Sequence, residues 1–169
     1  NKFKKEMGQY YSGEIFVSND NSVIKEADIV ILTTTSVGSI VSPEMLKKDA
    51  IVIDMAQPQN ISKNVCEARP DVLRVDGGYM TIPGINLGFK MGPPKETTFA
   101  CLTETIMSVI LGDKENHVGQ VDIGFAKQVY GMAKSVGFEL APLTNFSQPI
   151  ITKTEEVYYG RKAALAVAV

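Results

Sequence analysis

Residues 28–56 read DIVILTTTSVGSIVSPEMLKKDAIVIDMA, and this stretch decides the fold. The segments 29–32 and 51–53 are unbroken aliphatic runs, which are typical of parallel strands covered by helices on both faces. Between them, Ser42 and Pro43 form the usual start of a helix, with serine as the N-cap and proline at the first helical position. The stretch therefore predicts a strand–helix–strand unit with a right-handed crossover.

Further elements are expected on both sides of this unit. Towards the N-terminus we expect a basic helix, a strand at 14–17 and a short helix within 18–27. Beyond the unit we expect a strand at 72–75, an irregular arm or hairpin at 79–94, helices at 97–111 and 122–136, a short strand within 138–143 and a last helix at 155–169. Thr97 or Thr98 is the expected N-cap of the first of these helices, and Gly112 its stop.

The pattern as a whole predicts an α/β fold. We expect a partial Rossmann-like, doubly wound parallel sheet of at least four strands, with C-terminal helices. No GxGxxG phosphate turn occurs in the chain. Residues 1–143 are therefore interpreted as the C-terminal portion of a Rossmann-type dinucleotide-binding domain, and 144–169 as a tail with a helix.

Small or polar residues follow each of the three main predicted strands. In an open parallel sheet, ligands bind at the carboxyl ends of the strands. These positions predict a site for a flat ligand, formed by Thr33, Thr34, Thr35, Ser36, Val37, Asp54, Met55, Ala56, Gly77 and Gly78. Ordinary polar loops and turns explain the same residues about equally well, because a fold does not fix a function.

Cys101 is the candidate catalytic residue. It falls in the first turn of the helix at 97–111, where unpaired backbone N–H groups and the helix dipole favour a thiolate. Such a thiolate can accept an acyl group and present the thioester to hydride. The alternative is a thiol that packs in the core. His117 lies in a polar connector and is expected to be solvated.

Composition and charge exclude several classes of function. The net charge is −2 and no basic cluster occurs, so nucleic acid is not an expected partner. No apolar run approaches the roughly 20 residues that span a bilayer, and no signal peptide is recognised, so we expect a cytoplasmic protein. The two cysteines have no metal-like spacing, and no metal site is expected.

Four segments, in this order, carry a resemblance to a known family. They are ADIVILTTTSVGSIVSPEMLKKDAIVIDMAQPQNI, VDGGY, FACLTETIMSVILG and GFELAPL. Together they resemble the C-terminal half of the cyanobacterial acyl-(acyl carrier protein) reductases and the wider group labelled amino-acid or quinate/shikimate dehydrogenases. The segment around residues 28–56 also looks like the nucleotide domain of glutamyl-tRNA reductase. Met55-Ala56 departs from the family, which has glycines there.

The resemblance implies an enzyme that binds NADP or NAD, with the nicotinamide half at the strand ends. It implies that Cys101, within the FAC segment, takes an acyl group from a thioester of acyl carrier protein or CoA, and that hydride transfer then releases an aldehyde. The sequence leaves open the substrate, the choice between NAD and NADP, and the oligomeric state, for which a homo-oligomer is one option.

Two alternatives stay open beside this interpretation. One is an NAD(P)-dependent dehydrogenase of a small hydroxy or amino acid, in which Cys101 is structural and Lys90, Tyr79 or His117 donates the proton. The other is a non-catalytic nucleotide-binding or assembly module.

Overall fold

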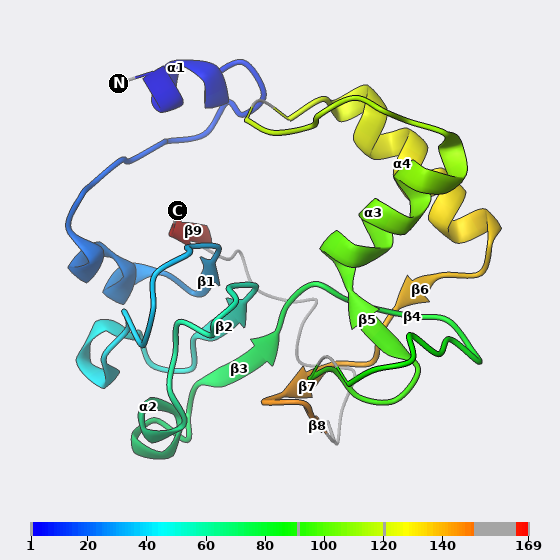
Figure 1. Ribbon diagram of the computed structural model, residues 1–169. Helices are drawn as coiled ribbons and strands as arrows, with labels where there is room; N and C mark the ends of the chain where they lie inside the picture. Colours follow the sequence, from blue (N-terminus) through cyan, green and yellow to red (C-terminus); the bar gives the residue numbers. More distant parts are fainter. Residues whose placement is uncertain (1, 91, 120, 151–164, 169) are drawn as a thin grey trace. The chain divides into compact units, whose positions relative to one another are not determined.

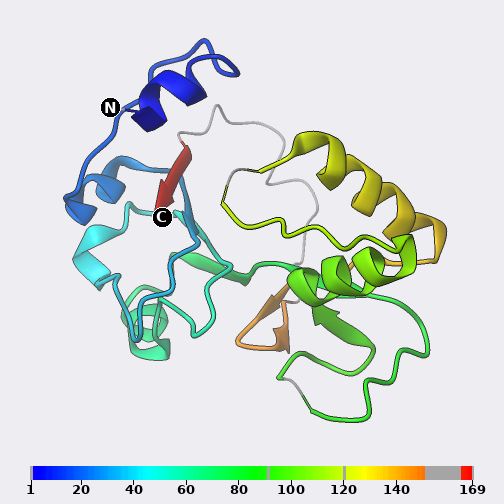
Figure 2. The ribbon, with the colours of Figure 1, turned by 45° about the horizontal axis from the view of Figure 1, so that its top comes forward.

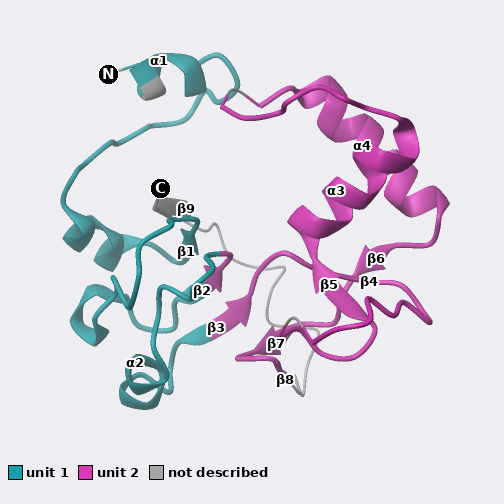
Figure 3. Ribbon diagram, in the orientation of Figure 1, with its two compact units in different colours: residues 1–52, 56–73, 162–169 teal, residues 53–55, 74–161 magenta. Residues whose placement is uncertain are grey.

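The computed structural model describes residues 2–90, 92–119, 121–150 and 165–168. The chain divides into two compact units, drawn in teal and magenta in Figure 3. Unit 1 comprises residues 1–52, 56–73 and 162–169, and unit 2 comprises residues 53–55 and 74–161. The dividing points fall inside strands β2 (Ile51–Asp54) and β3 (Leu73–Asp76), so both strands begin in unit 1 and end in unit 2.

The α/β class with a parallel sheet is confirmed. Strand β1 (Ile29–Leu32) lies in the parallel sheet of order β3-β2-β1 (Figure 1). Buried and half-buried residues alternate along β1 and β2, and Val30, Leu32 and Val52 are fully enclosed. One face of the sheet therefore carries the core more completely than the other, although both runs are aliphatic throughout.

A further strand, β9 (Leu165–Ala168), pairs in parallel with β1 at the edge of this sheet. The sequence had assigned these residues to the end of a last helix, and this part of the prediction is wrong. The backbone of this segment pairs with β1, and such pairing overrides the helical pattern of the sequence. The remainder of the expected helix, 155–164, lies outside the described residues.

Unit 1 contains short helices besides its part of the sheet. They are α1 (Lys2–Met7), η1 (Asn21–Glu26), η2 (Pro43–Met45) and α2 (Lys63–Ala68). The side chain of Asp20 caps η1 by accepting the N–H of Ser22 at 2.9 Å. Residues 14–17 form no strand, so the strand expected there is wrong.

The helix expected after Ser42 is only the single 3₁₀ turn η2. The backbone of Leu46 is already extended, and its buried side chain joins the core of unit 1. Arg69 donates from Nη1 to the carbonyls of Pro43 and Leu46, at 2.7 and 2.6 Å, and from Nη2 to Lys47 at 3.0 Å. These bonds satisfy carbonyls that a longer helix would have paired with its own N–H groups.

Unit 2 contains an antiparallel sheet and two helices. Strands β4 (Tyr79–Thr81), β5 (Thr97–Phe99) and β6 (Glu139–Leu140) are ordered β5-β4-β6, and β7 (Thr144–Asn145) pairs with β8 (Gln148–Pro149). Helices α3 (Ala100–Leu111) and α4 (Ile123–Ser135) lie side by side in both Figure 1 and Figure 2. Their core is formed by Met80, Met107, Ala133 and Phe138.

The sequence predicts the C-terminal end of α3 correctly but not its N-terminal end. Thr97 and Thr98 are not N-caps, because both lie in β5 and pair with β4; Phe99 occupies the cap position without a side-chain bond. Gly112 ends the helix as expected, with φ of 68°, a left-handed conformation that glycine adopts without strain. The carboxylate of Asp122 caps α4 by accepting the N–H groups of Gly124 and Phe125.

Throughout the part of the chain that is described, no helix combines the length and the apolar character that a membrane crossing requires.

Candidate functional site

The residues predicted to bind a cofactor divide between the two units. Residues 33–37 and Ala56 belong to unit 1, whereas Asp54, Met55 and the pair Gly77-Gly78 belong to unit 2, as does Cys101. Within each unit the structure shows what these side chains contact.

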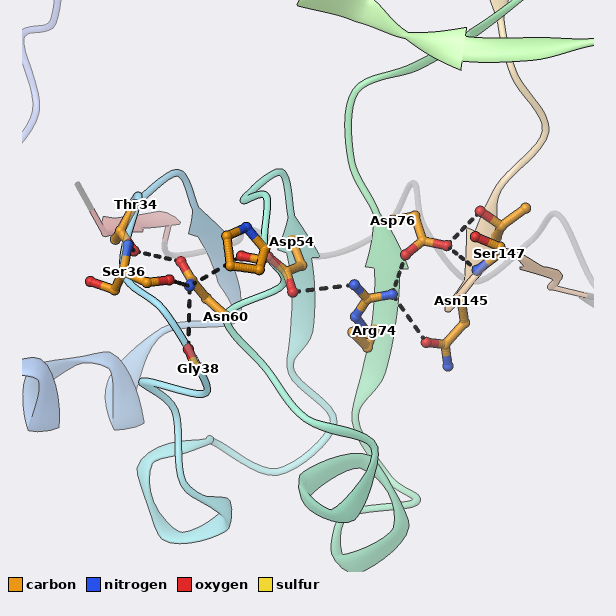
Figure 4. A network of polar contacts seen from close by, with 11 residues as sticks. Thr34, Ser36, Gly38, Asp54, Asn60, Arg74, Asp76, Asn145 and Ser147 are labelled. Atoms are coloured by element: carbon orange, nitrogen blue, oxygen red, sulfur yellow. Dashed lines mark hydrogen bonds and ion pairs between the residues drawn. The ribbon is translucent and has the colours of Figure 1, made fainter. Parts of the chain in front are cut away.

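In unit 1 the loop after β1 is organised by Asn60 (Figure 4). The Asn60 side chain is fully buried, and its Oδ1 accepts a hydrogen bond from the Thr34 hydroxyl at 2.5 Å. Its Nδ2 donates to the carbonyl of Ser36 at 2.9 Å and to that of Gly38 at 3.4 Å. Thr34 and Ser36 therefore help to fix the shape of the loop, and Val37, which is 92% exposed, has no packed environment.

No sequence motif selects Asn60, which stands in a polar loop between Pro58 and Ile61. Its role follows from contacts with residues more than 20 positions away, such as Thr34 and Ser36. A buried amide that pairs with several polar groups of one loop stabilises that loop. Loss of any of these hydrogen bonds would leave a buried polar group unpaired.

In unit 2 the carboxylate of Asp54 is bound by a buried arginine (Figure 4). Arg74 Nη2 lies 3.2 Å from Asp54 Oδ2, and Arg74 Nη1 donates to Asp76. The three side chains are almost completely enclosed, with exposed fractions of 1% for Arg74 and 2% for Asp54. Asp54 is thus engaged in a buried ion-pair network, a role that the sequence did not predict.

The same network attaches the segment containing β7 to the end of β3. Asp76 Oδ2 accepts hydrogen bonds from the Thr144 hydroxyl and the Ser147 N–H, both at 2.7 Å. The guanidinium of Arg74 lies 4.1 Å from the centroid of the Phe146 ring, a cation–π distance. The acidic residue at the end of β3 therefore fixes a hairpin of unit 2.

Gly77 and Gly78 are required by close packing and backbone conformation. A Cβ on Gly77 would lie 2.4 Å from Met55 Cγ and 3.0 Å from Ile53 Cγ2. Gly78 has φ of 75°, and its carbonyl accepts the N–H of Ala100 at 2.6 Å. The pair thus connects β3 to β4 and receives the first N–H of α3.

Cys101 lies in the first turn of α3, as predicted, and its thiol is free and exposed. Its backbone carbonyl accepts the hydroxyl of Thr105 at 3.0 Å. The structure therefore gives Cys101 an accessible thiol, and its catalytic role stays a prediction.

The three expected proton donors have different surroundings. Tyr79 is buried against Phe99, with ring centroids 5.4 Å apart, and burial raises the pKa of its hydroxyl. Lys90 is exposed. His117 is held in place: its Nε2 lies 2.6 Å from Asp113 Oδ2, and its ring stacks on Phe125 at 3.5 Å between centroids.

A cavity of about 430 Å³ lies between α3 and α4, entirely within unit 2. Its walls are largely apolar, and polar side chains reach it from α3 and from the connector before α4. They include Glu104, His117 and Asp122. Within the described ranges no group of three His, Cys, Asp or Glu side chains is arranged to hold a metal ion.

Comparison with known proteins shows a similarity to an aminotransferase. The chain is 23% identical over 150 residues to aminotransferase PigE of Serratia sp. (strain ATCC 39006). The match covers 84% of this chain but 17% of the relative, so the chain spans about a sixth of the length of that protein. No protein-family profile matches the chain.

This match corrects the predicted function. The relative is an aminotransferase, and transfer of an amino group is not the NAD(P)H-dependent reduction of a thioester or the dehydrogenation expected from the sequence. The expectation of an NAD(P)-dependent oxidoreductase, with its nucleotide-binding alternative, is therefore set aside. The resemblance to the acyl-(acyl carrier protein) reductases and the binding of NADP or NAD stay predictions that these comparisons do not test.

Proposed function

We propose that this chain is a segment of a larger enzyme that transfers amino groups, and that the segment supplies an α/β framework for a small-molecule substrate. The single observation that carries the proposal is the match to aminotransferase PigE over 84% of the chain. Because that match covers 17% of the relative, the segment would contribute one part of a longer protein.

Enzymatic amino-group transfer commonly uses pyridoxal phosphate. A lysine holds this cofactor as a Schiff base, and an Asp or Arg side chain contacts its pyridinium nitrogen. The described residues do not fit this group. All of the described lysines are exposed, whereas a Schiff-base lysine is activated by desolvation or by a neighbouring cation. Lys47, for example, forms an exposed ion pair with Asp28 at 2.7 Å.

The acidic candidates fit no better. Asp54 and Asp76, the buried carboxylates of unit 2, are both bound by Arg74. Neither is placed to hold a pyridinium nitrogen beside a lysine. We therefore propose that any cofactor lysine of the enzyme lies in a part of the protein other than the described residues.

The framework itself is proposed to be a partial Rossmann-like, doubly wound sheet. Three parallel strands with largely enclosed residues on one face support this, since purely parallel sheets occur almost only where helices cover them. The carboxyl ends of such strands are the usual place for a ligand.

Two measurements test the proposal. The complete protein, supplied with pyridoxal phosphate, should transfer ¹⁵N from labelled glutamate to an added 2-oxo acid or aldehyde, detected by mass spectrometry. The 169-residue chain, treated with pyridoxal phosphate and then borohydride, should show weak labelling spread over its exposed lysines. Absence of ¹⁵N transfer across a broad acceptor panel would overturn the enzyme assignment; stoichiometric labelling of one lysine would overturn the assigned role of the segment.

A further inference from the structure

We infer that the cavity between α3 and α4 binds a primary amine that has an apolar body. The cavity belongs wholly to unit 2, and its volume of about 430 Å³ is in the range of small-molecule sites. The inference deepens the proposed function by naming a substrate class, and it rests on that function only for the claim that the bound amine is a substrate.

The walls of the cavity suit an apolar ligand body. Val121, Phe125 and Val129 line it from α4 and the residues before it, and Met80 and Ala100 line it from the other side. Burial of apolar ligand surface against such side chains is favourable in proportion to the area removed from water. An alkyl or aromatic group therefore fits this part of the cavity.

The charged groups of the lining favour a cation. Glu104 and Asp122 contribute two carboxylates, and none of the described residues that line the cavity is a lysine or an arginine. Asp122 already accepts two backbone N–H groups at the start of α4. Glu104 is exposed, and among the described residues its carboxylate has no hydrogen-bond partner, so it can bind an ammonium group at the open side of the cavity.

His117 supplies the second polar contact, and its orientation is fixed. The Nε2–H group donates to Asp113 Oδ2 at 2.6 Å, and the ring is nearly parallel to Phe125, with 7° between the planes. The backbone N–H of Glu115 and the His117 ring hold the pKa of Asp113 below its ordinary value, so this acceptor is a carboxylate at neutral pH.

In the tautomer that carries its proton on Nε2, the Nδ1 lone pair is an acceptor. No described residue donates to it. An ammonium group at the polar end can therefore donate to Glu104 and to His117 Nδ1, whereas a ligand carboxylate there would be repelled by the carboxylates of Glu104 and Asp122. Shape and charge together select an apolar amine over an apolar acid.

The test uses three ligands with one body: 2-phenylethylamine, 2-phenylethanol and phenylacetate. Their binding to the 169-residue chain is measured by chemical-shift titration at neutral pH and moderate salt. We expect the amine to bind at least about tenfold more tightly than the alcohol, since a charge-assisted hydrogen bond is the stronger kind, and phenylacetate to bind most weakly.

Glu104→Gln should remove most of the preference for the amine over the alcohol, and His117→Asn should reduce it. Glu67→Gln is the matched control, since Glu67 is an exposed helical glutamate of α2 in unit 1. Shift changes should map to α3, α4 and residue 117. Binding of phenylacetate as tight as that of the amine, shifts elsewhere, or an unchanged preference in Glu104→Gln would each overturn the inference.

This result is separable from the proposed function. Amine binding in the cavity without ¹⁵N transfer by the complete protein would support the site and refute the enzyme assignment. Transfer of ¹⁵N by the complete protein without amine binding in the cavity would support the enzyme assignment and refute the site.

Discussion

Arg74 and Asp54 form an ion pair from which water is excluded, with Arg74 Nη2 at 3.2 Å from Asp54 Oδ2 and side-chain exposures of 1% and 0%. Arg74 also binds Asp76, so one guanidinium neutralises part of the charge of two buried carboxylates. An arginine on β3 thus binds the acidic residues at the ends of both β2 and β3.

Arg74→Ala should destabilise the protein by about 3–5 kcal/mol, because it leaves buried carboxylates without their cation. Urea unfolding followed by circular dichroism measures this. Lys47→Ala is the matched control: its ion pair with Asp28 has the shorter distance of 2.7 Å but is exposed, so the loss should be about 1 kcal/mol or less. Equal losses in the two variants would contradict the role assigned to Arg74.

Gly77→Ala should also destabilise the protein, by about 1–3 kcal/mol, because overpacking forces neighbours to move. Its new Cβ would lie 2.4 Å from Met55 Cγ and 3.3 Å from Met55 Cα, so the side chain cannot simply rotate away from all contact. Gly131→Ala in α4 is the opposite case: nothing lies within 4 Å of the new Cβ, and the change should stabilise the helix by about 0.5–1 kcal/mol. Thermal unfolding of both variants should show a lower melting temperature for Gly77→Ala and a higher one for Gly131→Ala. A Gly77→Ala protein as stable as wild type would show that the turn needs no glycine.

The lowered pKa of Asp71 leads us to expect that the protein loses stability in acid. The hydrogen bond from Arg69, at 2.7 Å, holds the pKa of the Asp71 carboxyl well below its ordinary value of 3.8. A group whose pKa is lowered on folding stabilises the protein above its unfolded pKa, and this contribution is lost as the pH falls towards the folded value. Wild type should therefore be more stable than Asp71→Asn at pH 7, and the difference in melting temperature should shrink below about pH 4. A difference that does not change with pH would rule out this linkage.

The sequence predicted those parts of the fold that local patterns determine. The aliphatic runs gave the positions of β1 and β2, and Gly112 and Asp122 gave the ends of α3 and α4, because strand burial and helix capping depend on near neighbours. The prediction was wrong at Thr97 and Thr98, where pairing with β4 overrides their capping preference. It was wrong at Leu165–Ala168 for the same reason, since pairing with β1 decides the state of that segment.

The candidate site was harder to predict. Cys101 was placed correctly in the first turn of its helix, but the partners of Asp54 and Thr34 are Arg74 and Asn60, which no local motif links to them. His117 is exposed, as expected, but its contacts with Asp113 and Phe125 were not predicted. The spacing of four between Asp113 and His117 was a weak signal, and the stacking on Phe125 depends on how α4 packs.

Cys101 and Cys66 should differ in their reaction with a thiol reagent. Cys101 is exposed at the start of α3, whereas Cys66 is half-buried and packs against the core of unit 1. Because only an accessible thiol can be attacked, N-ethylmaleimide should modify Cys101 at least several-fold faster under native conditions. Time-resolved peptide mass spectrometry measures both rates, with Cys66→Ala and Cys101→Ala proteins as references. In urea the two rates should become similar, because unfolding removes the protection of Cys66; a native rate for Cys66 equal to that of Cys101 would mean that this part of unit 1 opens readily.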